Sequence, residues 1–103
     1  MAIAQEVITT AGATLYTSAS GSSAITAMYL MNNHSSTVVV QLHIVLSGGS
    51  IGTSNKIIKD LSIAAGDTYV IDTERLVLGN GDSVRATADV DSVVYSTISY
   101  LGV

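Results

Sequence analysis

Apolar and polar residues alternate along much of this chain, with the two-residue period of a β-strand. In residues 37–46 the even positions are all apolar, and the odd positions mix Thr, Gln and His with Val. Such alternation predicts an antiparallel strand with one buried face. The same reasoning predicts strands over residues 5–9, 13–17, 24–31, 37–46, 56–63, 68–72, 83–89 and 92–101.

Turn-forming residues separate these segments at intervals of about 8–12 residues, which is typical of sandwiches and barrels. We therefore predict an all-β fold: a single antiparallel β-sandwich, jelly-roll-like or immunoglobulin-like, of about eight strands. The Asn/His/Ser cluster at residues 32–36 predicts a turn that joins strands 24–31 and 37–46 as a hairpin. The Gly/Ser-rich residues 47–55 predict a flexible loop.

A short repeat relates residues 61–68 to residues 76–83, with an offset of 15 residues. Each copy ends in a Gly-Asp pair followed by a new strand. Glycine permits a positive φ, and the Asp side chain can hold a turn. The repeat predicts two similar corners of one sandwich. If the copies are equivalent, four side chains after the corners point into the core: Tyr69, Ile71, Val84 and Ala86.

The chain is 103 residues long, which is enough for one domain with a modest core. We expect residues 1–12 to form an N-terminal strand or arm and residues 13–103 to form the sandwich. Residues 2–10 are apolar and could pair with the sheet edge of a neighbouring subunit, or could simply be the first strand. The first residues lack the basic and apolar regions of a signal peptide, which predicts a cytoplasmic product.

Charged residues make up only 12% of the chain, and the net charge is −4. With only four cations, the sequence predicts no nucleic-acid footprint. The absence of Cys excludes disulfides and thiolate metal sites. No apolar run approaches the roughly 18–20 residues of a membrane helix, so we expect no membrane partner.

Few residues suggest reactive chemistry. The two histidines, His34 and His43, have no neighbouring carboxylates to complete a metal site, although one His per protomer around a symmetry axis stays open. Residues 80–82 and 89–91 resemble calcium-loop fragments but predict Asx-type turns. No nucleophile elbow or phosphate loop occurs, and Glu6 and Glu74 are not a recognisable acid–base pair. We therefore predict no catalytic residue, no cofactor and no enzymatic activity.

Apolar residues occupy both faces of several predicted strands. Met28 and Met31, for example, fall on opposite faces of one strand. A sandwich buries one face of each sheet, so apolar outer faces with few charges indicate a homo-oligomer or a subunit docked on a larger assembly. The candidate interface residues are Ile3, Val7, Val39, His43, Val45, Tyr95 and Tyr100.

The order of motifs resembles that of small β-sandwich structural proteins of tailed bacteriophages. The similarity covers nearly the whole chain, although the family usually has proline in some loops and this chain has none. The matching stretches are Thr-Leu-Tyr-Thr at 14–17, Gly-Ser-Ser-Ala-Ile-Thr at 21–26, Met31 with Asn32, the Val-rich strand 37–46, the Gly-rich loop 47–55 and the Leu/Gly-Asp stretches 61–67 and 76–86.

This resemblance implies a non-enzymatic virion protein, above all a capsid decoration (cement) protein that bridges capsid subunits. It implies the major capsid protein or other virion proteins as partners, self-association with a trimer favoured, and assembly in the host cytoplasm. A neck, tail or baseplate component is the alternative. A third hypothesis is a carbohydrate-binding module, because the five tyrosines could form a platform that stacks on sugars.

Overall fold

The computed structural model describes residues 2–19, 21–72 and 76–102. Within these residues it contains nine β-strands and one 3-10 turn, η1 (Thr53–Asn55). The strands are β1 (Ala2–Ile8), β2 (Ala13–Thr17), β3 (Ser23–Asn32), β4 (Val38–Val45), β5 (Lys56–Ile63), β6 (Thr68–Ile71), β7 (Leu76–Leu78), β8 (Ser83–Ala88) and β9 (Val94–Gly102).

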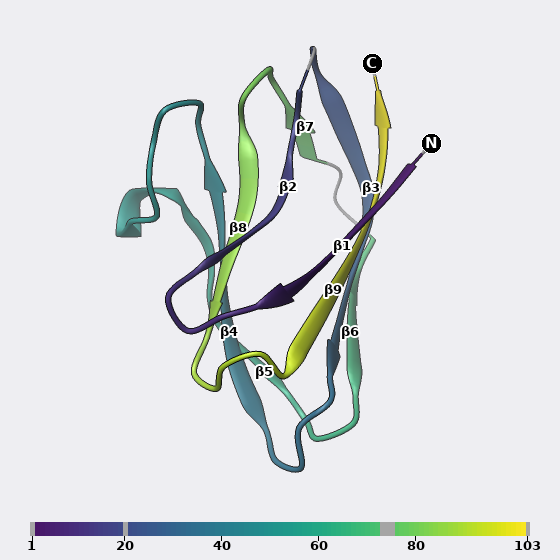
Figure 1. Cartoon of the computed structure of the whole chain (residues 1–103), viewed down its shortest axis with the longest axis vertical. Helices are drawn as coiled ribbons and strands as arrows, with labels where there is room; N and C mark the ends of the chain where they lie inside the picture. The colour runs from purple at the N-terminus through teal and green to yellow at the C-terminus, as the bar shows by residue number, and fades with distance from the viewer. Residues whose placement is uncertain (1, 20, 73–75, 103) are drawn as a thin grey trace.

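The strands form two antiparallel sheets that pack face to face, as the alternation predicts (Figure 1). The five-stranded sheet has the order β1-β9-β3-β6, and β7 also pairs with β3. The four-stranded sheet has the order β2-β8-β4-β5. The prediction of an all-β sandwich is confirmed.

Nested pairing of strands selects the jelly roll over the immunoglobulin arrangement. β1 pairs with β9, β2 with β8, β3 with β6 and β7, and β4 with β5, so the chain resembles a long hairpin wrapped into two sheets. β6 pairs with Met28–Met31 and β7 with Ser23–Ile25 of the same strand. β6 and β7 therefore lie end to end along the same edge of β3. Together they occupy the position of one strand, which explains why the structure has nine strands where the sequence predicts about eight.

The hairpin predicted over residues 24–46 is wrong. β3 belongs to the five-stranded sheet and β4 to the four-stranded sheet. The link of five residues can span at most about 17 Å, which exceeds the roughly 10 Å between packed sheets. A turn cluster marks a reversal of the chain, but it does not say whether the next strand pairs alongside or crosses to the opposite sheet.

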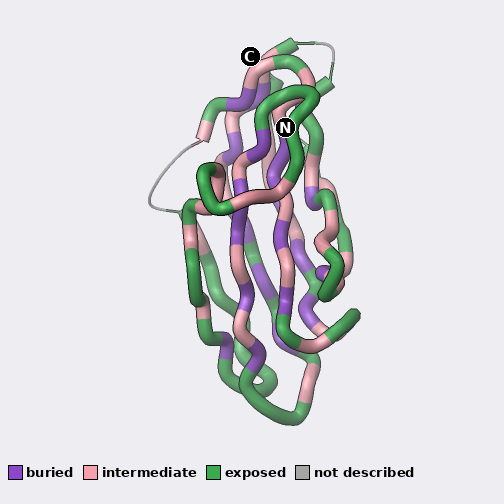
Figure 2. Tube along the Cα trace, turned by 90° about the vertical axis from the view of Figure 1, so that its left-hand side faces the viewer, coloured by how far each residue is buried: buried purple, intermediate pink, exposed green. Residues whose placement is uncertain are grey.

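The core lies between the sheets and is made by one side of every long strand. Figure 2 shows buried stretches alternating with half-buried ones along the strands, and exposed residues at the loops. The largest fully buried core side chains are Ile8, Ile25, Met28, Leu30, Leu42, Leu78 and Ile98.

The repeated Gly-Asp stretches form two corners, as predicted. Gly66 and Gly81 have φ of +77° and +88°. The first corner leads from the four-stranded to the five-stranded sheet, and the second leads back. Val84 and Ala86 are fully buried, but Tyr69 is 40% exposed, so its predicted core position is wrong. The reason is that β6 is a short edge strand, and its inward side lies at the rim of the sandwich.

Candidate interaction face

The outward side of the five-stranded sheet is the most unusual surface of the molecule. Residues directly opposite each other on antiparallel strands project to the same side. Two neighbouring rungs therefore place eight outward side chains in two rows: Val7, Tyr95, Met31 and Thr68 in one, and Gln5, Thr97, Tyr29 and Val70 in the other. We call this outward side the A face.

The A face gathers most of the exposed large apolar side chains of the described residues. They are Ile3, Tyr29, Met31, Val70, Val77, Tyr95 and Leu101. Single exposed apolar residues are normal on a protein surface, whereas a contiguous group marks a contact site. The A face therefore has the composition of an interface.

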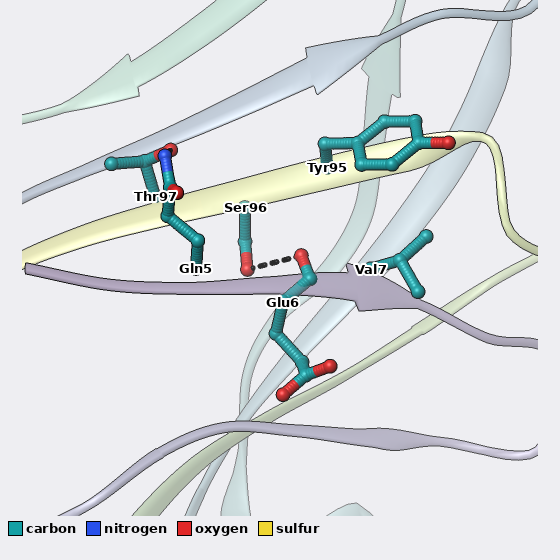
Figure 3. A pocket seen from close by; sticks show the side chains of 6 residues that line it. All are labelled: Gln5, Glu6, Val7, Tyr95, Ser96 and Thr97. Atoms are coloured by element: carbon teal, nitrogen blue, oxygen red, sulfur yellow. Dashed lines mark hydrogen bonds between the residues drawn. The ribbon is translucent and has the colours of Figure 1, made fainter.

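Charge is missing from this face. Glu6 is the only charged residue in the five strands of the sheet, and its partner Ser96 is buried between the sheets. Figure 3 shows the Glu6 carboxylate on the side of the sheet opposite to Val7 and Tyr95. The four-stranded sheet differs, because its outward side carries Arg85 and, around a second hollow, Asp60 and Asp89.

An open hollow of about 360 Å³ lies between β1 and β9 on the A face. Gln5 and Thr97 stand at one end, and Val7 and Tyr95 at the other (Figure 3). Gln5 Nε2 donates to Thr97 Oγ1 at 3.3 Å. Glu6 and Ser96 complete the lining, and the Glu6 carboxylate points to the other side of the sheet from Val7 and Tyr95. On the A face the walls therefore offer apolar surface and neutral polar side chains, which suit an uncharged side chain.

Three of the predicted interface residues, Ile3, Val7 and Tyr95, lie on the A face. Val39 lies half-buried on the outward side of the four-stranded sheet, in the second hollow. The positions of these four agree with an outward orientation. Whether they contact a partner stays a prediction.

His43 and Val45 do not line an outer surface, because they are 2% and 0% exposed. Their side chains project away from the main core, but the loop of residues 46–55 contacts them, and Asn55 hydrogen-bonds His43. A Cβ placed on Gly49 would lie 3.3 Å from Val45 Cγ1. Strand alternation therefore gave the correct side of the sheet, and the chain's own loop covers that side.

Asn55 holds this covering loop in place. Its Oδ1 lies 2.8 Å from His43 Nδ1 and accepts from the Gly52 N–H at 3.1 Å. Its Nδ2 donates to the Ser50 carbonyl at 2.8 Å. His43 Nε2 is buried without a hydrogen-bond partner among the described residues. The expected flexible loop is thus fastened through one amide.

Tyr100 is half-buried on the inward side of β9. Its partner in the register, Ile25, is buried in the core. Its ring stacks on Tyr16 from the opposite sheet, with ring centroids 4.1 Å apart. The ring therefore helps to close one end of the sandwich, and whether Tyr100 contacts a partner stays a prediction.

The aspartates hold chain segments together. Asp82 accepts from the N–H groups of Ser47 and Gly79, as expected of a turn residue. Asp89 and Asp91 accept from distant backbone, at Val39 and Thr10, and so act across the fold. Asp91 also accepts from the neighbouring Ser92 hydroxyl at 3.2 Å. In the described residues no three His, Cys, Asp or Glu side chains gather as metal ligands. Glu74 lies outside the described residues.

Five members of the A face are not among the predicted interface residues: Tyr29, Met31, Val70, Val77 and Leu101. The available signal was the absence of charge from whole strands, since β3 and β9 contain no charged residue. The surface could not be predicted from this signal alone, because the sequence does not show that β3 and β9 are neighbours in one sheet.

No helix in the described part of the chain has the length and apolar character needed to span a membrane. The sequence matches no family model and no curated protein.

Proposed function

We propose that this chain is a non-enzymatic structural protein of a phage virion, and specifically a capsid decoration protein. The observation that carries the proposal is the uncharged, apolar A face. A surface of this kind is costly to leave in water and favours a subunit that works by being packed against neighbours. The order of motifs along the chain supports the same role.

In this role the protein stabilises a shell by adding buried contact area between capsid subunits. The sandwich supplies rigid faces, and β1 supplies an edge, because it pairs with β9 on one side only. The free backbone groups of an edge strand can pair with a strand of a neighbouring subunit. Residues 2–10 would then connect subunits as an arm or as an edge.

The deciding experiment is to locate and count the chain in purified particles of the phage that encodes it. Quantitative mass spectrometry should find hundreds of copies per particle, and immunogold labels should lie over the head. Six or twelve copies at the tail axis would favour the neck, tail or baseplate alternative. Absence from particles would refute both.

A carbohydrate-binding module is the second candidate, because Tyr29 and Tyr95 lie diagonally on two neighbouring rungs of the A face, with Gln5 and Thr97 beside them. Aromatic faces with neutral polar neighbours can stack on sugar rings. A glycan array separates the two readings: specific binding that Tyr95→Ala abolishes would favour the module. No binding, together with no thermal shift on adding Ca²⁺, would remove it.

A further inference from the structure

We infer that the A face pairs with the A face of a second copy of this chain, around a twofold axis parallel to the strands. The inference deepens the proposed structural role, on which it rests, by naming the partner of this face. The argument has three parts: charge, area and shape.

The charge distribution favours a second copy as the occupant. Two identical faces that carry charge oppose like charges when they meet, whereas no charged side chain of the five strands points to the A face. The whole chain has a net charge of −4. Pairing through the A face therefore brings no charged strand residues of the two copies against each other. A twofold contact also buries the same patch on both copies at once.

The area of the A face is sufficient for a stable dimer. β3 has ten residues and defines the length of the face, which is about 33 Å at about 3.3 Å per residue. Four strands side by side, about 4.8 Å apart, give a width of about 19 Å. The product is about 600 Å² per copy, which reaches the lower end of standard protein interfaces.

The shape of the A face is complementary to itself. Tyr29 and Met31 project from β3, while the hollow lies between β1 and β9 on the other side of the sheet's midline. The register puts both features on the same two rungs, since Tyr29 faces Thr97 and Met31 faces Tyr95. A twofold axis between β9 and β3 exchanges the two sides of the face and keeps each rung at its height. It therefore places β3 of each copy against β9 of the other, with Tyr29 and Met31 beside the other copy's hollow.

Thr97 tests this geometry because it lies close to the proposed axis. Thr87 is a matched control: it is also a half-buried threonine on an inner strand, but it faces outward from the four-stranded sheet. Analytical ultracentrifugation of the full chain should show a monomer–dimer equilibrium. Thr97→Lys should weaken dimerisation by about 100-fold, since like charges then face each other, and Thr87→Lys should leave it unchanged. Mixing Thr97→Lys with Thr97→Glu should restore dimers.

A cross-linking measurement keeps the inference testable if the lysine variant does not fold. The natural chain contains no cysteine, so one introduced thiol is unique. Thr97→Cys should form a disulfide-linked or bismaleimide-linked dimer in high yield, and Thr87→Cys should not.

Three outcomes would each overturn the inference. They are a chain that is monomeric at about 100 μM, a chain that forms a trimer, and a dimer that Thr87→Lys disrupts and Thr97→Lys does not. A monomer or trimer that is nevertheless found on phage heads would leave the proposed function standing. A dimer through the A face that is absent from particles would refute the proposed function alone.

Discussion

At the scale of single residues, the side-chain amides of Asn32 and Asn55 each join separate segments of the chain. Asn32 is fully buried at the end of β3. Its Nδ2 donates to the carbonyls of Ser36, Ile63 and Ala64, and its Oδ1 accepts from the His34 N–H. One side chain therefore ties the β3–β4 crossing to the end of β5.

Replacing Asn32 tests this connection. Asn32→Ala should lower the free energy of unfolding by about 3 kcal/mol, because several buried polar groups lose their partner. Asn32→Asp should cost at least as much, since a carboxylate cannot donate to the three carbonyls. Urea unfolding measures both, with exposed Asn33→Ala as the control, expected within about 0.5 kcal/mol of the natural chain. An Asp variant as stable as the natural chain would contradict this role.

Asn55 is the corresponding residue of the loop that covers the four-stranded sheet. Asn55→Ala should lower the free energy of unfolding by about 1–2 kcal/mol, because His43 Nδ1 stays buried without its partner. Amide exchange at Gly52 should also become faster, since its N–H loses an acceptor. The neighbouring Ser54 is exposed, and Ser54→Ala is the control. Equal stability of the two variants would show that the loop is held by other contacts.

At the scale of elements, the two corners share a backbone conformation but differ in their surroundings. Gly66 and Gly81 both have a positive φ, which strains any residue with a Cβ. A Cβ on Gly66 would meet nothing within 4 Å. A Cβ on Gly81 would lie 2.8 Å from Ser47 Cβ. The second corner is therefore packed against the end of β4, and the first is free.

This difference predicts unequal effects of the same substitution. Gly66→Ala should cost about 1 kcal/mol, which is the backbone strain alone. Gly81→Ala should cost about 2–3 kcal/mol, because overpacking adds to that strain. Ser47→Gly should recover the added part in the double variant. Thermal and urea unfolding of the natural chain, Gly81→Ala, Ser47→Gly and the double variant completes the cycle, and Gly66→Ala is measured beside them. Equal losses at both corners would refute the packing difference.

At the scale of the whole molecule, nested pairing joins the first strand to the last. β1 pairs with β9 and β2 with β8, so most contacts link residues that are distant in the sequence. Non-local pairing slows folding, because loop closure costs entropy before the contacts form. The chain also contains no proline.

Refolding should therefore be slow for a small domain yet free of a proline phase. Stopped-flow refolding should give a main phase of milliseconds to seconds, as in other sandwiches. Double-jump experiments should find no phase of tens of seconds that grows with time spent unfolded. Low protein concentration, or the Thr97→Lys variant, removes any association step. A slow phase that depends on unfolding delay would contradict the prediction.

The sequence by itself determined the fold class, most strand positions and both corners, because these depend on local properties. Alternation identified β2 and β5 with their observed bounds. The Gly-Asp repeat identified two turns that need a positive φ. Three of the predicted interface residues, Ile3, Val7 and Tyr95, also lie on the A face.

Only the tertiary structure decided which strands share a sheet, and with it what each outward side contains. The β3–β4 link crosses from one sheet to the other. β3 pairs with β9 instead of β4, so two strands without charged residues lie side by side in one sheet. The alternation pattern also could not predict that residues 46–55 cover and bury His43 and Val45. Alternation assigns a residue to a side of its strand, but burial depends on what distant parts of the chain bring to that side.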